Sequence, residues 1–144
     1  MRLKKFVFIL LTIFITSCSG DNKDTPNNEV IYDYSDVTDK MITYENLFSL
    51  ESNIYFVYIY SLTCGHCKNL KNRIISYALN HDNFYLLEYV SNIPIYETIE
   101  TTIGSTNYVD VGILGTPSLL EIYKHVLVSN IAGENEIIKT LSNL

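Results

Sequence analysis

The chain is organised around the stretch Thr63-Cys64-Gly65-His66-Cys67-Lys68, in which two residues separate a pair of cysteines. It follows directly on residues 54–60, IYFVYIY, a short run rich in aromatic and β-branched residues that predicts a buried strand over 54–61. After it, residues suited to a helix core recur at three- and four-residue steps, at Cys67, Leu70, Ile74 and Ala78. This spacing predicts a helix over about 64–79. Cys64 would then lie at a helix N-terminus, where free N–H groups and the helix dipole favour a thiolate, and Cys67 would follow one turn later, within disulfide reach.

The first eighteen residues predict an export signal. A basic start precedes an apolar core, Phe6 to Ile15, that is too short for a stable transmembrane helix. The sequence Ile15-Thr16-Ser17-Cys18 resembles the cleavage region of a bacterial lipoprotein. That resemblance implies removal of residues 1–17, a lipid on Cys18, and an extracytoplasmic protein anchored to a bacterial membrane. The alternative is an ordinary signal peptide cleaved nearby, with Cys18 incidental.

The number of cysteines fits this interpretation. A lipid on Cys18 leaves Cys64 and Cys67 as a pair with no odd thiol. The loop between them contains two residues, so a disulfide there would restrict the unfolded chain very little. In a compartment where disulfides persist, such a pair is expected to carry out redox chemistry.

The charge balance argues against two classes of partner. The whole chain has a formal charge of −6, and residues 1–17 hold three of its ten basic residues and none of its acids. The remainder therefore has seven basic and sixteen acidic residues, a charge of −9. We expect no nucleic-acid partner and no electrostatic docking on anionic lipid, so that the lipid anchor makes the membrane contact. We also expect a monomer.

Three segments follow along the chain: the signal (1–17), the lipidated cysteine with a polar, flexible tether (18–29), and one domain (30–144). Residues 30–39 could begin with an edge strand or extend the tether. The later elements are a short helix at 44–50 with Thr43 as N-cap, strands at 54–61 and 84–90, a helical stretch at 94–101, a polar loop at 102–110, strands at 119–123 and 126–131 joined by a tight turn at Lys124-His125, and a helix at 134–144. This order predicts an α/β fold, a central mixed sheet with helices on both faces.

Residues 42–144 resemble the thioredoxin superfamily. Cys64-Gly65-His66-Cys67-Lys68 matches the active-site sequence of protein disulfide isomerases, and Gly115-Thr116-Pro117-Ser118 resembles the family's cis-proline segment. The resemblance implies that Cys64 is the nucleophile and Cys67 the resolving thiol, supported by Gly65, His66 and Lys68. It also implies that Pro117 faces them in the cis form, while Thr116 offers backbone groups to an extended substrate.

The sequence departs from the family at three points. Thr63 stands where an aromatic residue often precedes the first cysteine, and the chain has no tryptophan. Tyr58 occupies the position of a buried acid that thioredoxins and disulfide isomerases carry six residues before that cysteine. Glu88, on the neighbouring strand, could replace that acid as proton acceptor for Cys67, or it could be a surface residue.

These features predict thiol–disulfide exchange on proteins without a cofactor, recharged by a separate redox partner protein. The helix N-terminus and a protonated His66 would stabilise the Cys64 thiolate, which favours oxidase or isomerase activity. An extracytoplasmic reductase is the first alternative. The others are a copper chaperone of the same fold, with His125 joining the cysteines, and a non-catalytic binding module.

Overall fold

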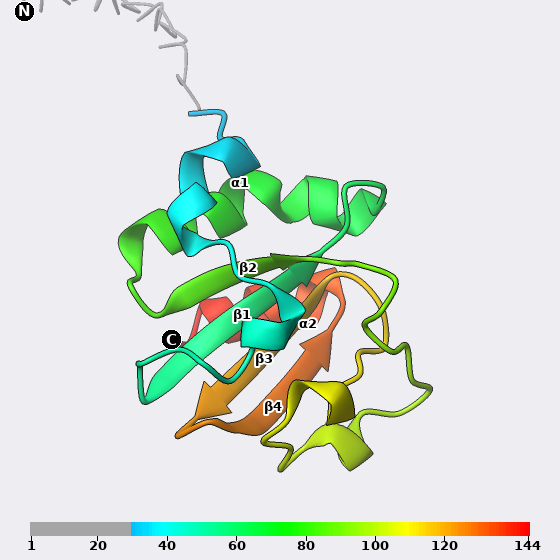
Figure 1. Cartoon of the computed structure of the whole chain (residues 1–144). Coiled ribbons are helices and arrows are strands. Elements are labelled where there is room, and N and C mark those ends of the chain that lie inside the picture. Colours follow the sequence, from blue (N-terminus) through cyan, green and yellow to red (C-terminus); the bar gives the residue numbers. More distant parts are fainter. Residues whose placement is uncertain (1–29) are drawn as a thin grey trace, which may run out of the picture.

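The computed structural model describes residues 30–144. The predicted signal (1–17), Cys18 and the tether to residue 29 lie outside the described residues. The sheet contains β1 (Ile54–Tyr60), β2 (Phe84–Glu88), β3 (Ser118–Tyr123) and β4 (Val126–Ala132), and the α-helices are α1 (Gly65–Asn80) and α2 (Glu134–Leu141) (Figure 1). The 3-10 helices are η1 (Tyr34–Lys40), η2 (Tyr44–Asn46), η3 (Glu100–Thr102) and η4 (Tyr108–Asp110).

The four strands form one mixed sheet in the order β2-β1-β3-β4. β1 and β2 are parallel and are joined by the crossover through α1, whereas β3 runs antiparallel to both β1 and β4. β1 is therefore central and covered on both faces, which explains why six of its seven residues are buried and why its sequence is apolar without alternation. The predicted turn joins β3 to β4, with positive φ angles at Lys124 and His125.

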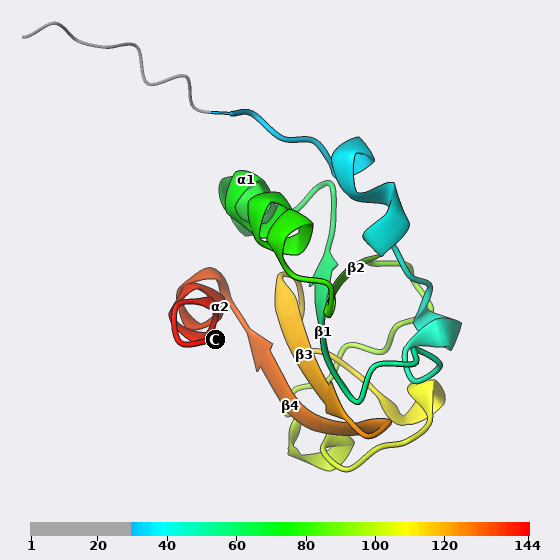
Figure 2. The same cartoon turned by 90° about the vertical axis from the view of Figure 1, so that its left-hand side faces the viewer.

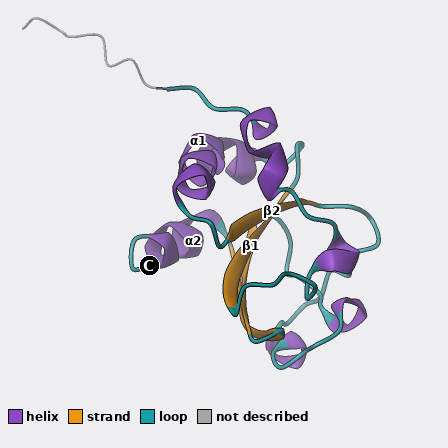
Figure 3. Cartoon of the chain, turned by 60° about the vertical axis from the view of Figure 1, so that its left-hand side comes forward, coloured by secondary structure: helices purple, strands orange, loops and turns teal. Residues whose placement is uncertain are grey.

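The two faces of the sheet are covered differently. Both α-helices pack on one face, against Phe56, Tyr58 and Tyr60 of β1 (Figure 2). The other face, which includes Tyr55 and Val57, is covered by loops and 3-10 turns (Figure 3). The buried residues that these segments contribute are Tyr44, Leu47, Ile93, Val111 and Ile113. Helices thus lie on both faces, as predicted, but those on the second face are single 3-10 turns.

The predicted helical stretch at 94–101 is wrong. Ile95 forms a parallel bridge with Ile113, in which Ile113 N–H donates to the Pro94 carbonyl at 3.0 Å and Tyr96 N–H donates to Ile113 at 2.9 Å. These backbone groups are therefore not available for a helix, and only Glu100–Thr102 forms a 3-10 turn. The predicted polar loop at 102–110 includes the 3-10 helix η4.

Three other predicted boundaries were too long. The helix expected at 44–50 is a 3-10 turn that ends at Asn46, and the Thr43 side chain does not cap it. β2 ends at Glu88 rather than at residue 90. α2 ends at Leu141 rather than at residue 144.

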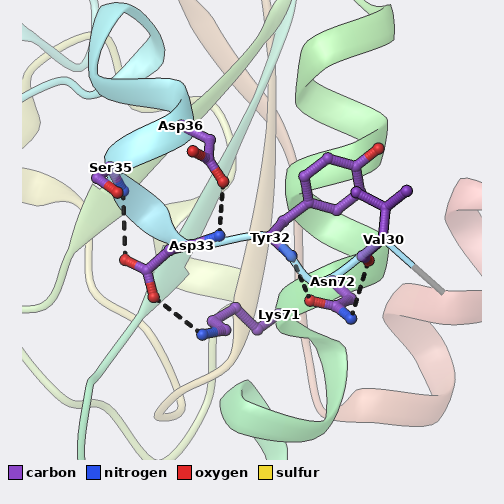
Figure 4. Close-up of polar contacts among 7 residues, drawn as sticks. All are labelled: Val30, Tyr32, Asp33, Ser35, Asp36, Lys71 and Asn72. Carbon is purple, nitrogen blue, oxygen red and sulfur yellow. Dashed lines mark hydrogen bonds and ion pairs between the residues drawn. The ribbon is translucent and has the colours of Figure 1, made fainter. Parts of the chain in front are cut away.

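The segment at 30–40 is neither an edge strand nor a tether. Asp33 caps η1 and forms an ion pair with Lys71 of α1 at 3.0 Å (Figure 4). The Asn72 side chain accepts the Tyr32 N–H at 3.1 Å and donates to the Val30 carbonyl at 3.5 Å. These contacts attach the segment along α1, so it is an integral part of the domain.

Among residues 30–144, no helix combines the length and the apolar character needed to cross a membrane.

Candidate active site

Cys64 is positioned by the junction between β1 and α1. It is the N-cap of α1, with extended backbone angles (φ −77°, ψ 122°), and the helix begins at Gly65. The Cys67 N–H, one of the free donors of the first helical turn, donates to Cys64 Sγ at 3.2 Å. The sulfur thus takes the place that a serine or aspartate oxygen usually occupies at an N-cap. It receives the hydrogen bond and the positive end of the helix dipole together.

A distant segment of the chain completes the site. The Thr116–Pro117 peptide bond is cis, as predicted, and the Cys64 thiol donates to the Thr116 carbonyl at 3.2 Å. The Ser118 hydroxyl donates to the Gly115 carbonyl at 2.7 Å, which fixes this segment at the start of β3. The structure therefore brings the predicted cysteine and proline segments together across 52 residues.

The two cysteines differ in exposure. Both are free thiols, Cys64 half-buried and Cys67 buried. Burial by itself would raise the pKa of the Cys64 thiol, but hydrogen bonds from Cys67 and from the Thr116 side chain outweigh it and bring that pKa below its usual value. Burial, together with the hydrogen bond to Cys64, raises the pKa of Cys67 to about 11. The accessible sulfur is thus the one that ionises first.

His66 is held by a residue that the sequence did not indicate. Its Nδ1 lies 2.8 Å from Oε2 of Glu134, the first residue of α2, and Asn69 Nδ2 donates to the same oxygen at 3.3 Å. Hydrogen bonds from His66 and then Asn69 lower the pKa of Glu134. His66 itself acts on the pKa of Cys64 through its backbone N–H. The imidazole that was expected to stabilise the thiolate therefore has a carboxylate beside it.

The remaining side chains near the cysteines lie at the surface. Lys68 is exposed and lines, with Lys71 and Glu88, a cavity of about 600 Å³. Glu88 is exposed at the end of β2 and is not among the groups that shift the pKa of Cys67. Its interpretation as a surface residue is therefore the one that fits. Arg73 donates to the Ser142 hydroxyl at 3.0 Å.

The other two histidines make contacts away from the two cysteines. His125 lies in the β3–β4 turn, at the opposite end of β3 from Pro117, with its Nδ1 2.9 Å from the Phe48 carbonyl. Six residues of strand separate these ends by about 20 Å. His81 stacks on Tyr77 at the end of α1. Within residues 30–144 no three His, Cys, Asp or Glu side chains are grouped as metal ligands.

The sequence matches no protein-family model and no curated protein at a significant level. Solved structures of thioredoxins are similar to it. Thioredoxin f from spinach chloroplast (short form) is 12% identical, with 72% of this chain and 90% of that chain covered and a TM-score of 0.50. The thioredoxin of Malassezia sympodialis is 12% identical (72% and 87% covered, TM-score 0.49), and that of Schistosoma mansoni is 15% identical (73% and 95% covered, TM-score 0.46).

At these identities the likeness concerns the fold alone. Together with the sheet order, it confirms the predicted α/β thioredoxin fold.

Proposed function

We propose that this thioredoxin-fold chain is a thiol–disulfide oxidoreductase that acts on exported proteins through Cys64 and Cys67. The observation that carries the proposal is the unequal pair at the start of α1. Cys64 is partly exposed and has a lowered pKa, whereas Cys67 is buried behind it with a raised one. Exchange requires such a pair, because one sulfur must meet a protein substrate and the other must then displace it.

In the oxidase direction the pair starts as a disulfide. A substrate thiolate attacks Cys64 Sγ, the Cys64–Cys67 bond breaks, and Cys67 leaves with the electron pair and takes up a proton. A second substrate thiolate then attacks the substrate sulfur of the mixed disulfide and releases the Cys64 thiolate. The substrate gains one disulfide and the protein becomes a dithiol. A separate disulfide-bearing protein would reoxidise it by the same exchange.

Thr116 fits the role of substrate contact. Its carbonyl accepts the Cys64 thiol proton at 3.2 Å in the dithiol form. That proton is lost once Cys64 joins a substrate in a mixed disulfide. The carbonyl then becomes free to accept a backbone N–H of an extended substrate at the moment when the substrate is bound. Pro117 follows it and is buried against the site.

For the direction of exchange we propose oxidase or isomerase activity, because the lowered pKa of Cys64 stabilises the reduced pair and so makes the disulfide more oxidising. Glu134 beside His66 works against this and supports the reductase as second candidate. Equilibration with glutathione separates the two. An oxidase should lie near the disulfide-isomerase potential of about −180 mV, and a value at or below about −270 mV would establish the reductase.

The activity itself is tested by trapping. Cys67→Ser should accumulate mixed disulfides with reduced, unfolded ribonuclease supplied with an oxidant, and Cys64→Ser should not. The unmodified chain should either form disulfides in that protein or reduce insulin. A reversed trapping pattern would exchange the roles of the two cysteines, and a chain inactive in both assays would refute the proposal.

The location is proposed from the sequence alone, on the signal-like residues 1–17 and the cysteine that follows them. We propose lipidation at Cys18 and attachment to the outer face of a bacterial membrane. Mass spectrometry of the membrane-extracted protein should show an acylated N-terminal Cys18. A chain that begins at another residue without lipid would contradict it.

A further inference from the structure

Tyr58 carries a hydroxyl group that is buried inside the domain. It lies in the middle of β1, fully buried, on the face of the sheet that α1 covers. Its hydroxyl has no hydrogen-bond partner among the described residues. Such a group weakens folding, because it loses its bonds to water and gains none in the protein.

The other buried tyrosines have partners. The Tyr44 hydroxyl donates to the Val111 carbonyl at 2.6 Å, and the Tyr55 hydroxyl donates to the Leu47 carbonyl at 2.8 Å. The Tyr60 hydroxyl points to Met41 Sδ at 4.0 Å. The fold thus satisfies a buried phenol wherever a neighbour allows it, and within residues 30–144 Tyr58 is the exception.

The group that faces the Tyr58 hydroxyl is the Cys67 thiol. Both residues belong to the same buried cluster, from facing elements β1 and α1. Burial is the main cause that raises the pKa of Tyr58, and the charge of the nearby Cys67 is the next. The other titratable groups that act on Tyr58 are Tyr34 of η1 and Cys64. None of them is a carboxylate. Cys67 itself has hydrogen bonds with Cys64, the Ser61 backbone and the Thr116 side chain.

We propose that the Tyr58 hydroxyl is a hydrogen-bond donor that stabilises the Cys67 thiolate when Cys67 leaves the disulfide or attacks a mixed disulfide. The inference rests on the proposed function and deepens it. A neutral thiol is a weak acceptor, so the hydroxyl has little to bind while Cys67 is protonated. A thiolate is a strong acceptor, and a bond that forms only with the charged sulfur stabilises the transition state more than the resting state.

The phenol cannot act instead as the base that removes the Cys67 proton. Burial holds its pKa far above the usual value of tyrosine, so the hydroxyl stays protonated wherever the protein is folded at moderate pH. Its contribution is therefore donation alone. The proton of Cys67 must leave by way of solvent or the substrate sulfur at Cys64.

Tyr58→Phe tests the proposal, because it removes the hydroxyl and keeps the ring. The matched control is Tyr60→Phe, which removes a hydroxyl from the same strand and the same face. The probe is glutathione joined to Cys64, and the readout is the rate at which Cys67 releases it between pH 6 and 9. We expect Tyr58→Phe to release glutathione about tenfold more slowly at each pH and to move the rate profile to higher pH. Tyr60→Phe should match the unmodified chain.

Stability separates this role from a structural one. Tyr58→Phe should unfold at the same or a higher urea concentration, since it removes an unsatisfied buried group. If that variant does not fold, 3,5-difluorotyrosine at position 58 retains the shape with a stronger donor and should speed release. Unchanged release by folded Tyr58→Phe, or by the fluorinated protein, would overturn the proposal. Loss of exchange in the unmodified chain would instead refute the proposed function.

Discussion

Cys64 and Cys67 carry the same thiol in two surroundings, and the difference can be measured. Alkylation of Cys64 by iodoacetamide should reach half of its full rate below the ordinary thiol value of about 8.5, because hydrogen bonds lower its pKa. Alkylation of Cys67 should stay slow until about pH 11, because burial raises its pKa. Peptide mass spectrometry assigns each site, with Cys67→Ser as control. A common titration near 8.5 at both positions would contradict the described site.

Glu134 is expected to restrain the oxidising power of the pair. Glu134→Gln removes one negative charge beside His66 and keeps a hydrogen-bonding side chain. The Cys64 thiolate should become more stable, so the equilibrium with glutathione should shift toward the reduced protein by about two- to threefold. Glu136→Gln is the matched control, an exposed acid of the same helical turn whose partner is Lys139. Equal shifts in both variants, or a shift toward the disulfide, would show that Glu134 has no such effect.

The parts of the site that could be predicted are those with a local signal. The cysteine pair and the start of α1 are defined by consecutive residues, and Thr116-Pro117 matches the family's cis-proline segment. Glu134 has no such signal, because it lies 68 residues from His66 in the sequence. In the sequence it is also indistinguishable from any acidic residue in the first turn of a helix. Tyr58 departs from the family pattern in the sequence, but its proximity to Cys67 depends on how α1 packs on β1.

At the scale of elements, the strongly patterned segments were predicted well. β1, α1 and the β3–β4 hairpin lie within two residues of their predicted bounds, because a dense apolar pattern and turn residues define them. The segment at 94–101 was not predictable in this way. Its backbone pairs with Ile113, a partner further along the chain, and this tertiary pairing overrides local helix preference.

The attachment of residues 30–40 to α1 gives an element-scale prediction. Asn72→Ala removes both hydrogen bonds that hold Tyr32 and Val30, and should lower the free energy of unfolding by about 1–2 kcal/mol. Amide exchange should rise in residues 30–36 and stay unchanged in β3. Lys71→Ala, which loses an exposed ion pair with Asp33, should have a smaller effect. Equal exchange across the whole domain would show that the segment does not open separately.

At the scale of the whole molecule, the raised pKa values of buried tyrosine and cysteine side chains make the stability of the fold sensitive to high pH. Burial raises the pKa of Tyr44, Tyr55 and Tyr60 to about 12, and that of Cys67 to about 11. Unfolded tyrosine ionises near pH 10 and cysteine near 8.5, so the unfolded chain releases these protons first. Stability is therefore complete below about pH 8.5 and falls as the pH rises toward 12.

This sensitivity can be followed by urea unfolding with far-ultraviolet circular dichroism between pH 7 and 11.5. A phenol whose pKa rises from 10 to about 12 contributes up to roughly 3 kcal/mol, so the urea midpoint should drop steeply above pH 10. Reduced Cys67→Ser should retain a constant midpoint to a higher pH than the unmodified chain. A midpoint independent of pH up to 11.5 would mean that these groups are exposed in solution.

The tyrosines around Cys67 also determine the intrinsic fluorescence of the protein. The chain has twelve tyrosines and no tryptophan. No energy is therefore transferred from tyrosine to an indole, and the emission comes from the phenols. The Tyr34 and Tyr60 rings are stacked with centroids 3.9 Å apart, and Tyr58 lies nearly parallel to Tyr60 at 6.3 Å. Their cluster contains Cys67, and Cys64 packs against it. A disulfide quenches an excited ring beside it more strongly than a thiol does. The tyrosine fluorescence of the unlabelled protein therefore reports whether the two cysteines form a disulfide. The fluorophores are tyrosines of the protein's own hydrophobic core.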